Sequence, residues 1–338
     1  MRLASSTAAP RQAVLLAALL AHVAVANACG GGDDSGWGRA LGGGGGRRTI
    51  GVVLPTRGTP FYQELEAGLR EAAKRAKYEL VVTAGDMSNP AAAAAAQVGQ
   101  VDGLLRRRVD AVVIAPIDSL AVVPAVERAN AARVPVFTVG LHPHGGRIVS
   151  HVQADHVGTG QLAAEYLTSF LSEKGNVAVV SRAGIAALAE RDQGFRDALR
   201  TAHRVVTVVD SVASGGGRAA VEAAVEAMLK AHREIDAIFS VDDAGALGAY
   251  DAAMARYRAD LFIVGCDASP ETLQLIQTEG PLKASLVQQP RQMGERLIQL
   301  AARHFADEPV APRVLVPVRL VNIDSLRPAG KPTAGRSR

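Results

Sequence analysis

Cysteine is scarce in this chain, which has only Cys29 and Cys266 among its 338 residues. One lies near the N-terminus and the other in an apolar run, so the pair does not predict a disulfide framework. Cys266 is interpreted as a core residue, because buried thiols behave as small hydrophobic side chains. Runs of five or six like charges are also missing: 37 Lys and Arg and 33 Asp and Glu are interspersed and leave a net charge of +4. A nucleic-acid partner is therefore not expected.

Aromatic residues are few as well, at 4% of the chain, whereas hydrophobic residues make up 48%. This composition is typical of a globular protein whose core is built from Ala, Val, Leu and Ile. A chain of 338 residues exceeds the ~100 to 200 residues of one ordinary domain, so two domains are expected.

The sequence lacks a clear catalytic set. His142 and His144 form an H-x-H pair, but no Cys or further His stands near them in sequence to complete a zinc site. Residues 214–217, Ser-Gly-Gly-Gly, are the best candidate for a phosphate loop before a helix, yet they lack the Gly-Lys-Ser/Thr ending. We expect neither catalysis nor a metal or cofactor, and the anion loop stays a minor alternative.

The N-terminus has the pattern of a secretory signal. Residues 1–11 carry two Arg and no acid, residues 13–26 are almost wholly apolar, and Ala-Asn-Ala at 26–28 provides small residues at a cleavage spacing. The apolar run is shorter than the ~20 residues that a membrane-spanning helix needs. The sequence therefore predicts a signal peptide at 1–28 and a periplasmic or cell-envelope location.

Cys29 directly follows this signal. Its place resembles that of the lipidated cysteine of bacterial lipoproteins, although Ala26 and Asn27 depart from the usual lipobox. Lipidation of Cys29 and simple cleavage both stay open. Residues 29–48 are Gly-rich, a composition that behaves as a flexible coil, and are predicted to form a tether.

From residue 49 onward, short apolar runs alternate with segments of helical length. This alternation predicts parallel sheets covered by helices on both faces. Because so many strands in one sheet would be unusual, we expect an α/β fold of two doubly wound lobes with a ligand cleft between them. The expected strands are 50–54, 80–83, 111–115, 134–139, 148–152, 177–181, 205–209, 237–240, 261–266, 284–288 and 314–318.

In open α/β sheets, ligands bind beyond the carboxyl ends of the strands. Phe61 and Tyr62 follow the first strand and could either stack on a sugar ring or simply pack the lobe. Asp267 and Asp242 follow two later strands; carboxylates there either accept hydrogen bonds from hydroxyl groups or cap helices. Asp243 is the stronger candidate for a cap. Two further candidates add planar polar groups, namely Arg191 and Gln288.

Taken together, these residues resemble the ribose-binding branch of the periplasmic sugar-binding proteins, whose fold is shared with the effector domains of lac-repressor-like regulators. The resemblance extends from about residue 49 to 318. The motifs that carry it are Thr-Pro-Phe-Tyr at 59–62, Ala-Pro-Ile-Asp at 115–118, Ser-His-Val at 150–152 with Asp155, Glu190-Arg191 with Gly194-Phe195, Asp242-Asp243 with Ala-Leu-Gly at 246–248, Val-Gly-Cys-Asp at 264–267, and Gln288 with Pro290.

The resemblance implies two lobes joined by three hinge strands, with crossovers near Gln153, Gln288 and Leu315. Lobe one would comprise 49–153 plus 289–315, lobe two 154–288 plus 316–327, and a flexible tail 328–338. The resemblance also implies that a ligand stacks on lobe-one aromatic rings and hydrogen-bonds to polar side chains. The residues so assigned are Phe61, Tyr62, Arg191, Asp242, Asp267 and Gln288.

The chain departs from the ribose-binding pattern at several points. Gly140 and Leu141 stand where an Asp-Arg pair is expected, Ala115 and Thr59 replace Asn, and Gly215 replaces an aromatic residue. Because a site that bonds specific hydroxyl groups discriminates strongly when a partner is missing, these changes argue against ribose. They predict a roomier, less polar pocket on the lobe-one side.

The expected function is that of the monomeric solute-binding component of an ABC importer. It would capture a small neutral sugar or polyol and deliver it to a permease and ATPase complex. The alternative is a sensory protein that presents its closed form to a chemoreceptor or sensor kinase. A DNA-binding regulator is disfavoured because a signal peptide stands where the DNA-binding domain would be.

Overall fold

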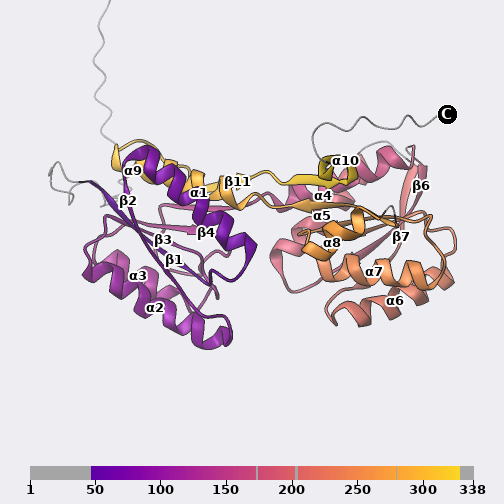
Figure 1. The fold of residues 1–338 in the computed structure, drawn as a ribbon, viewed down its shortest axis with the longest axis horizontal. Helices are drawn as coiled ribbons and strands as arrows, with labels where there is room; N and C mark the ends of the chain where they lie inside the picture. The colour runs from indigo at the N-terminus through magenta and orange to yellow at the C-terminus, as the bar shows by residue number, and fades with distance from the viewer. Residues whose placement is uncertain (1–46, 173, 202–204, 279, 328–338) are drawn as a thin grey trace, which may run out of the picture. The chain divides into compact units, whose positions relative to one another are not determined.

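The computed structural model describes residues 47–172, 174–201, 205–278 and 280–327, and all of them fall in one compact unit. The predicted signal peptide, Cys29, most of the tether and the tail at 328–338 lie outside these residues. Two six-stranded sheets organise the chain (Figure 1). We call the sheet that contains the first strand, with its helices, lobe one, and the other sheet with its helices lobe two.

Lobe one is a wholly parallel sheet in the order β11-β5-β4-β3-β1-β2. Its central strands are buried along nearly their whole length, as continuous apolar runs predict. The strands are β1 (Thr49–Leu54), β2 (Glu79–Ala84), β3 (Ala111–Ile114), β4 (Val136–Val139), β5 (Ser150–Ala154) and β11 (Arg313–Val316). The helices are α1 (Pro60–Ala76), α2 (Pro90–Arg106), α3 (Val123–Ala131) and α9 (Pro290–Phe305).

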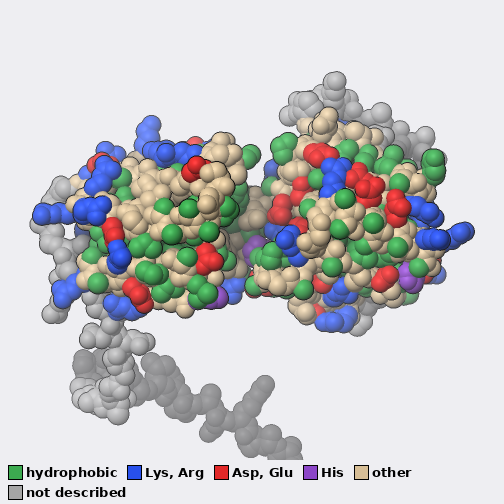
Figure 2. Space-filling model, turned by 90° about the horizontal axis from the view of Figure 1, so that it is seen from below, with side chains coloured by type: hydrophobic (Ala, Val, Ile, Leu, Met, Phe, Trp, Pro, Cys, Tyr) green, Lys and Arg blue, Asp and Glu red, His purple; other side chains and the backbone are tan. Residues whose placement is uncertain are grey.

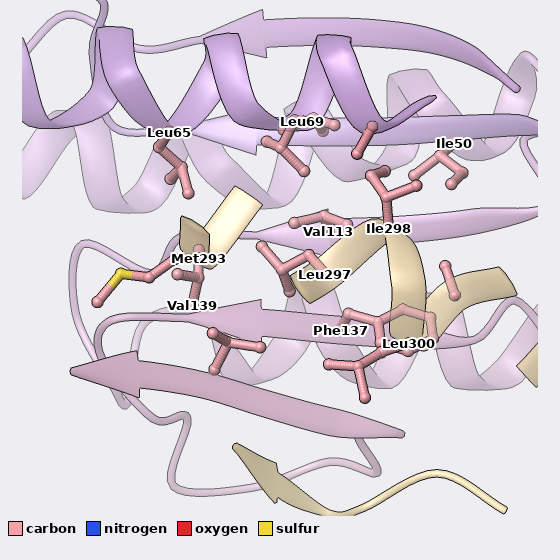
Figure 3. Close-up of a cluster of buried hydrophobic side chains, with 14 of the residues drawn as sticks. Ile50, Leu65, Leu69, Val113, Phe137, Val139, Met293, Leu297, Ile298 and Leu300 are labelled. Carbon is pink, nitrogen blue, oxygen red and sulfur yellow. The ribbon is translucent and has the colours of Figure 1, made fainter. Parts of the chain in front are cut away.

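Helices α1 and α9 cover one face of this sheet, and α2 and α3 cover the other (Figure 1). In Figure 3, Leu65 and Leu69 of α1 point toward the sheet beside Leu297 of α9, and they meet Val113 and Phe137 of the strands. All five side chains are fully buried. Each buried side chain of this size contributes roughly 1.5–3 kcal/mol, so this layer stabilises lobe one.

Lobe two repeats the plan in the order β12-β10-β9-β8-β6-β7, parallel except for the antiparallel pair of β10 and β12. One core lies under α4 and α5, and a second lies under α6, α7 and α8. The strands are β6 (Lys174–Ser181), β7 (Val205–Ala213), β8 (Ala237–Ser240), β9 (Phe262–Cys266), β10 (Leu282–Val287) and β12 (Arg319–Asn322). The helices are α4 (His156–Phe170), α5 (Ala186–Thr201), α6 (Arg218–Ala231), α7 (Asp243–Ala255), α8 (Pro270–Ile276) and α10 (Ile323–Leu326).

The chain passes between the sheets at three places: after β5, after β10, and between β11 and β12. The predicted fold class of two doubly wound lobes is therefore confirmed. One predicted element is wrong: 314–318 is not a single strand. The strand ends at Val316, before Pro317, which lacks the N–H that a ladder needs, and β12 was not predicted at all. The residue boundaries assigned to the lobes remain a prediction of where the chain hinges.

In each lobe, two helices cross at glycines. Gly68 of α1 faces the backbone of Arg291 in α9, and Gly194 of α5 faces the backbone of Val157 in α4. A Cβ added at either glycine would collide with a carbonyl oxygen. These glycines are therefore required by close helix packing rather than by a turn.

Gly194→Ala is expected to lower the free energy of unfolding by about 2–3 kcal/mol, because an overpacked core must move backbone to admit the methyl group. The matched control is Gly99→Ala in α2, where no atom lies within 4 Å of the added Cβ. Alanine is a better helix former, so this control should raise stability by up to about 1 kcal/mol. Urea unfolding of both variants measures the difference; equal effects would contradict the packing argument.

Among the described residues, no helix is long and apolar enough to cross a membrane.

Candidate functional site

A cleft of about 1060 Å³ is lined by residues from both lobes and from the crossover segments. It lies where strand ends and helix starts meet, as expected for an open α/β sheet. The lining residues are Pro60, Phe61, Tyr62, Glu64, Gly140, Leu141, His156, Ile185, Ala187, Leu188, Arg191, Asp267, Ala268, Val287, Gln288, Gln289, Pro290, Arg291, Gln292 and Arg319.

Phe61 and Tyr62 occupy the first turn of α1, directly after Pro60 at its N-terminus. Their ring centroids lie 5.1 Å apart at an interplanar angle of 87°, and both rings pack against the lobe-one core. Burial raises the pKa of the Tyr62 phenol, which stays neutral at physiological pH. The two rings therefore pack the lobe and also line the cleft, and their stacking on a sugar ring stays a prediction.

Arg191 and Asp267 form the polar centre of the lobe-two wall. Arg191 of α5 is only 3% exposed; its Nη1 donates to the Val241 carbonyl at 2.7 Å and its Nη2 to Asp267 Oδ1 at 2.9 Å. Asp267 follows β9 with a left-handed φ of 78° and keeps 38% of its side chain exposed. Asp tolerates this conformation better than most residues. The ion pair thus fixes a partly exposed carboxylate at the cleft wall.

Cys266 lies directly beneath this pair and is fully buried. Burial raises the pKa of its thiol to about 12, so it remains protonated. The interpretation of Cys266 as a core residue is confirmed.

His156 lines the cleft but was missed by the sequence reasoning. It is the first residue of α4, just after the N-cap Asp155, and is 9% exposed. Its Nδ1 has no hydrogen-bond partner among the described residues. Burial, followed by the nearby charge of Arg191, lowers the pKa of its imidazole to about 4. The strand-end rule could have found it, because it stands two residues beyond the last residue of β5.

Gln288 lines the cleft in the short segment between β10 and α9, and its predicted hydrogen bond to a ligand stays a prediction. The next residue, Gln289, connects two crossovers, since its Nε2 donates to the Pro317 carbonyl at 2.8 Å. Arg319 at the start of β12 adds a cation to the lining. The crossover segments therefore contribute polar groups of their own.

Asp242 is not among the residues that line the cleft. It is 7% exposed and caps α7: its carboxylate accepts from the Gly245 N–H at 2.8 Å and from Ser214 Oγ at 3.0 Å. Asp243, favoured as the cap from the sequence, is instead the first helical residue and accepts from Thr272 Oγ1 at 2.5 Å. That assignment was wrong because Asp242 has the extended backbone that an N-cap requires. The predicted contact of Asp242 with a ligand stays a prediction.

Three of the lobe-one positions that depart from the ribose-binding pattern, Gly140, Leu141 and Ala115, lack a polar side chain. Leu141 is 44% exposed and lines the cleft, and Gly140 beside it has no atom within 4 Å of an added Cβ. Ala115 is buried, and its carbonyl accepts from the Gln97 side chain. On the lobe-two side, Ile185 is 42% exposed in the same cleft. The cleft therefore presents apolar side chains from both lobes.

The minor alternatives gain no support from the geometry. Within the described ranges, no three His, Cys, Asp or Glu residues lie close enough to hold a metal ion. His142 packs its ring against His151 with centroids 4.8 Å apart. In the Ser-Gly-Gly-Gly loop, Ser214 is committed to the α7 cap, and neither it nor Gly217 lines the cleft.

Comparison with known proteins identifies the family. The sequence profile described as periplasmic binding protein domain matches residues 50–309. The chain belongs to this family. It is 32% identical over 274 residues to the ribose import binding protein RbsB of Salmonella typhimurium, which covers 81% of this chain and 90% of that protein. The resemblance drawn from the strand-end motifs is thus confirmed.

Solved structures share the fold of this periplasmic binding protein. AraP, an arabinose binding protein from Geobacillus stearothermophilus, matches with a TM-score of 0.75 at 19% identity, over 82% of this chain and 98% of that one. A chain solved in a XylFII–LytSN complex matches with a TM-score of 0.74 at 19% identity, over 83% of this chain and 99% of that one. These similarities show the fold alone.

Two buried histidines make stability depend on pH. His151 is 1% exposed, and its Nδ1 and Nε2 lie 2.9 Å from Thr138 Oγ1 and 3.0 Å from Gln153 Oε1. Burial lowers its pKa to about 4, as for His156. An unfolded histidine takes up a proton near pH 6.5. Each residue therefore contributes stability that is complete above pH 6.5 and is lost as the pH falls toward 4.

We expect the free energy of unfolding to fall by about 2 kcal/mol per histidine between pH 7.5 and 5. Urea unfolding at both pH values measures this loss. His156→Asn should remove its share of the pH dependence. An unchanged slope in the His156 variant would show that this imidazole is protonated as readily in the folded chain as in the unfolded chain.

Proposed function

We propose that this chain is the solute-binding component of an ABC importer and that it captures a small neutral sugar or polyol in the cleft. The observation that carries the proposal is the Arg191–Asp267 pair, which holds a partly exposed carboxylate on the same cleft that Phe61 lines. A carboxylate accepts hydrogen bonds from hydroxyl groups, and an aromatic ring packs on the C–H face of a sugar. The named relative is a ribose import binding protein, which supports the same class of ligand.

The ligand we propose carries an apolar part. Leu141 and Ile185 are large hydrophobic side chains left 44% and 42% exposed within the cleft. A ligand that covers them removes apolar surface from water, at roughly 25 cal/mol per Å². A deoxy or alkyl-substituted sugar gains binding free energy by covering these side chains, whereas a fully hydroxylated pentose leaves hydroxyl groups without partners.

Capture is proposed to work by a population shift. Ligand contacts with both lobes favour a closed form, and the shift is as large as the difference in affinity between the two forms. The segments that would bend are the three crossovers after β5, after β10 and between β11 and β12. A membrane permease would then recognise the closed form.

A thermal-shift screen of the chain from residue 47 onward tests the proposal. The panel comprises pentoses, hexoses, deoxy sugars, polyols, nucleosides and phosphorylated controls. A ligand at 100 times its Kd adds about 2.7 kcal/mol of stability, worth a few degrees for a chain of this size. Stabilisation by a neutral sugar or polyol supports the proposal. A response to phosphorylated compounds alone would replace it with an anion-binding function.

A sensory role is the second candidate, and the chain of similar fold solved in a XylFII–LytSN complex favours keeping it. In that case the closed form would dock on a receptor or kinase rather than on a permease. Reconstitution of the ligand-loaded protein with its candidate permease and ATPase separates the two. Stimulated ATP hydrolysis supports import, and its absence, together with ligand-dependent binding to a receptor ectodomain, supports sensing.

Export and lipidation are part of the same proposal. The signal at 1–28 and Cys29 lie outside the described residues, so their support is the sequence pattern alone. A lipid on Cys29 would keep the protein at the membrane after cleavage. Cys29→Ser would then release the protein from the membrane fraction of cells, whereas a protein cleaved without lipidation would be soluble in both forms.

A further inference from the structure

The two lobes differ in net charge, although positive and negative residues are interspersed along the sequence. The segments that form lobe one, 47–154 and 289–316, hold 17 Lys and Arg against 12 Asp and Glu. Those that form lobe two, 155–288 and 317–327, hold 14 Lys and Arg against 19 Asp and Glu. The formal charges are therefore about equal and opposite, and the molecule is strongly dipolar.

The excess positive charge of lobe one gathers at one edge of its sheet. The register places the first residues of β1, β2, β3 and β4 side by side, and α1, α2 and α3 all end at this edge. Figure 2 shows Lys and Arg side chains crowding the end of lobe one at the left of the view. We call this edge the basic pole, and define it by Arg47, Arg48, Lys77, Arg106, Arg107, Arg108 and Arg133.

Three of these cations occupy turns where glycine is favoured. Lys77, Arg108 and Arg133 follow the ends of α1, α2 and α3 with φ of 60°, 56° and 56°. A residue with a Cβ costs roughly 1 kcal/mol or more in this left-handed region, and glycine is the usual choice after a helix. Cations also interact favourably with helix C-termini, but only by about 0.3–1 kcal/mol. These three positions therefore add cations to the basic pole.

Most cations of the basic pole are not paired with a carboxylate of the described residues. Arg48 pairs with Asp110 at 2.9 Å, and Arg47 donates to the backbone carbonyls of Lys77 and Tyr78. No carboxylate of the described residues forms a salt bridge with the exposed Lys77, Arg106, Arg107, Arg108 or Arg133, although Glu79 and Glu127 lie in the neighbouring elements. An uncompensated positive surface remains.

We propose that the basic pole docks on the anionic phospholipid surface of the membrane beside which the exported chain acts. This inference rests on the proposed function for the location of the chain. The predicted tether, residues 29–48, enters the described part of the chain at Arg47, so a lipid on Cys29 would be linked to the chain at the basic pole. A polybasic patch beside a lipid anchor adds electrostatic attraction to an anionic membrane surface.

The chemistry favours a lipid surface over other polyanions. Each Lys or Arg near an anionic bilayer contributes about 1 kcal/mol and requires no shaped groove. Single-stranded nucleic acids instead need exposed aromatic rings for stacking, and the aromatic residues at this edge, Tyr78 and Phe305, are half-buried against each other. The acidic lobe two is repelled by the same surface, so docking would orient the molecule with lobe one toward the membrane.

Vesicle co-sedimentation tests the proposal with the chain from residue 29 onward carrying Cys29→Ser, which removes any acyl anchor. The probes are vesicles of phosphatidylcholine with about a third phosphatidylglycerol, and vesicles of phosphatidylcholine alone. We expect binding to the anionic vesicles only, and its loss in high salt, because exposed charges are screened beyond a few ångströms at 1 M. The triple variant Arg106→Gln, Arg107→Gln and Arg108→Gln should bind at least tenfold more weakly.

The matched control changes three exposed cations of lobe two, Lys230→Gln, Arg233→Gln and Arg256→Gln, and should bind within twofold of the parent. The proposal would be overturned if both triple variants lost vesicle binding equally, or if the protein bound neutral vesicles. It would also be overturned if the protein bound heparin but not anionic vesicles. The sugar-induced thermal shift should persist in both variants. A failure of the docking surface can thus be told from a failure of the proposed function.

Discussion

Asp267→Ala is expected to weaken ligand binding by more than tenfold, which corresponds to more than ~1.4 kcal/mol. The carboxylate is held at the cleft wall by Arg191 and is the acceptor that we assign to ligand hydroxyl groups. Its loss leaves the ligand hydroxyl groups without this acceptor and Arg191 Nη2 without its carboxylate partner. Isothermal titration with the sugar found in the thermal-shift screen measures the change.

Backbone strain is separated from the loss of the acceptor by a second variant. Asp267 has a φ of 78°, which alanine adopts less readily than Asp or Asn. Asp267→Asn keeps the conformation and one acceptor oxygen, so it should weaken binding less than the alanine variant does. Asp260→Ala, an exposed carboxylate paired with the nearby Arg258, is the control and should bind normally. Unchanged affinity in both Asp267 variants would remove this residue from the site.

Arg191→Met is expected to lower both stability and affinity, and to have the largest effect on stability of any change in the cleft. The guanidinium is 3% exposed and joins the end of β8 to the loop after β9 through Val241 and Asp267. Removing one partner of a buried pair leaves the other uncompensated. Because Asp267 is partly exposed, we expect the free energy of unfolding to fall by about 2–4 kcal/mol. Differential scanning fluorimetry should show a decrease in Tm of roughly 5–10 °C.

The control is Arg196→Met, one turn further along α5. Arg196 pairs with Asp192 within the same helix and is 31% exposed. Its substitution should therefore lower the free energy of unfolding by less than about 1 kcal/mol. If Arg191→Met were as stable as this control, the pair would be a surface contact rather than a support for the cleft. Normal ligand affinity in a folded Arg191 variant would contradict the binding role that we assign to the lobe-two wall.

Most of the fold follows from the sequence because its signals are local. The apolar runs that end at Leu54, Val139 and Cys266 are nearly continuous, as strands buried on both faces must be, and each appears as a strand in the structure. The pattern failed at Pro317: the strand expected at 314–318 ends at Val316, and β12, which belongs to the other sheet, begins at Arg319. Periodicity cannot show that a chain changes partner in the middle of a run, because partner choice is a tertiary property.

The candidate site, too, was predicted in part from the sequence and in part only visible in the structure. Phe61, Tyr62, Arg191, Asp267 and Gln288 were found from the rule that ligands bind beyond strand ends, and the structure brings all five to one cleft. The rule could not distinguish Asp242 from them, because a carboxylate after a strand serves equally well as a helix cap, and only the bonds to Gly245 and Ser214 show that it does so.

Fold class, family and the candidate strand ends follow from the order of residues, because each depends on residues close together in the chain. Three features required the folded chain: His156 enters the cleft with a nitrogen that has no partner among the described residues, two pairs of helices meet at glycines, and charges interspersed along the chain separate into a basic and an acidic lobe. The physical reason is that burial, desolvation and electrostatic fields depend on neighbours in space, and these neighbours cannot be read from the order of residues.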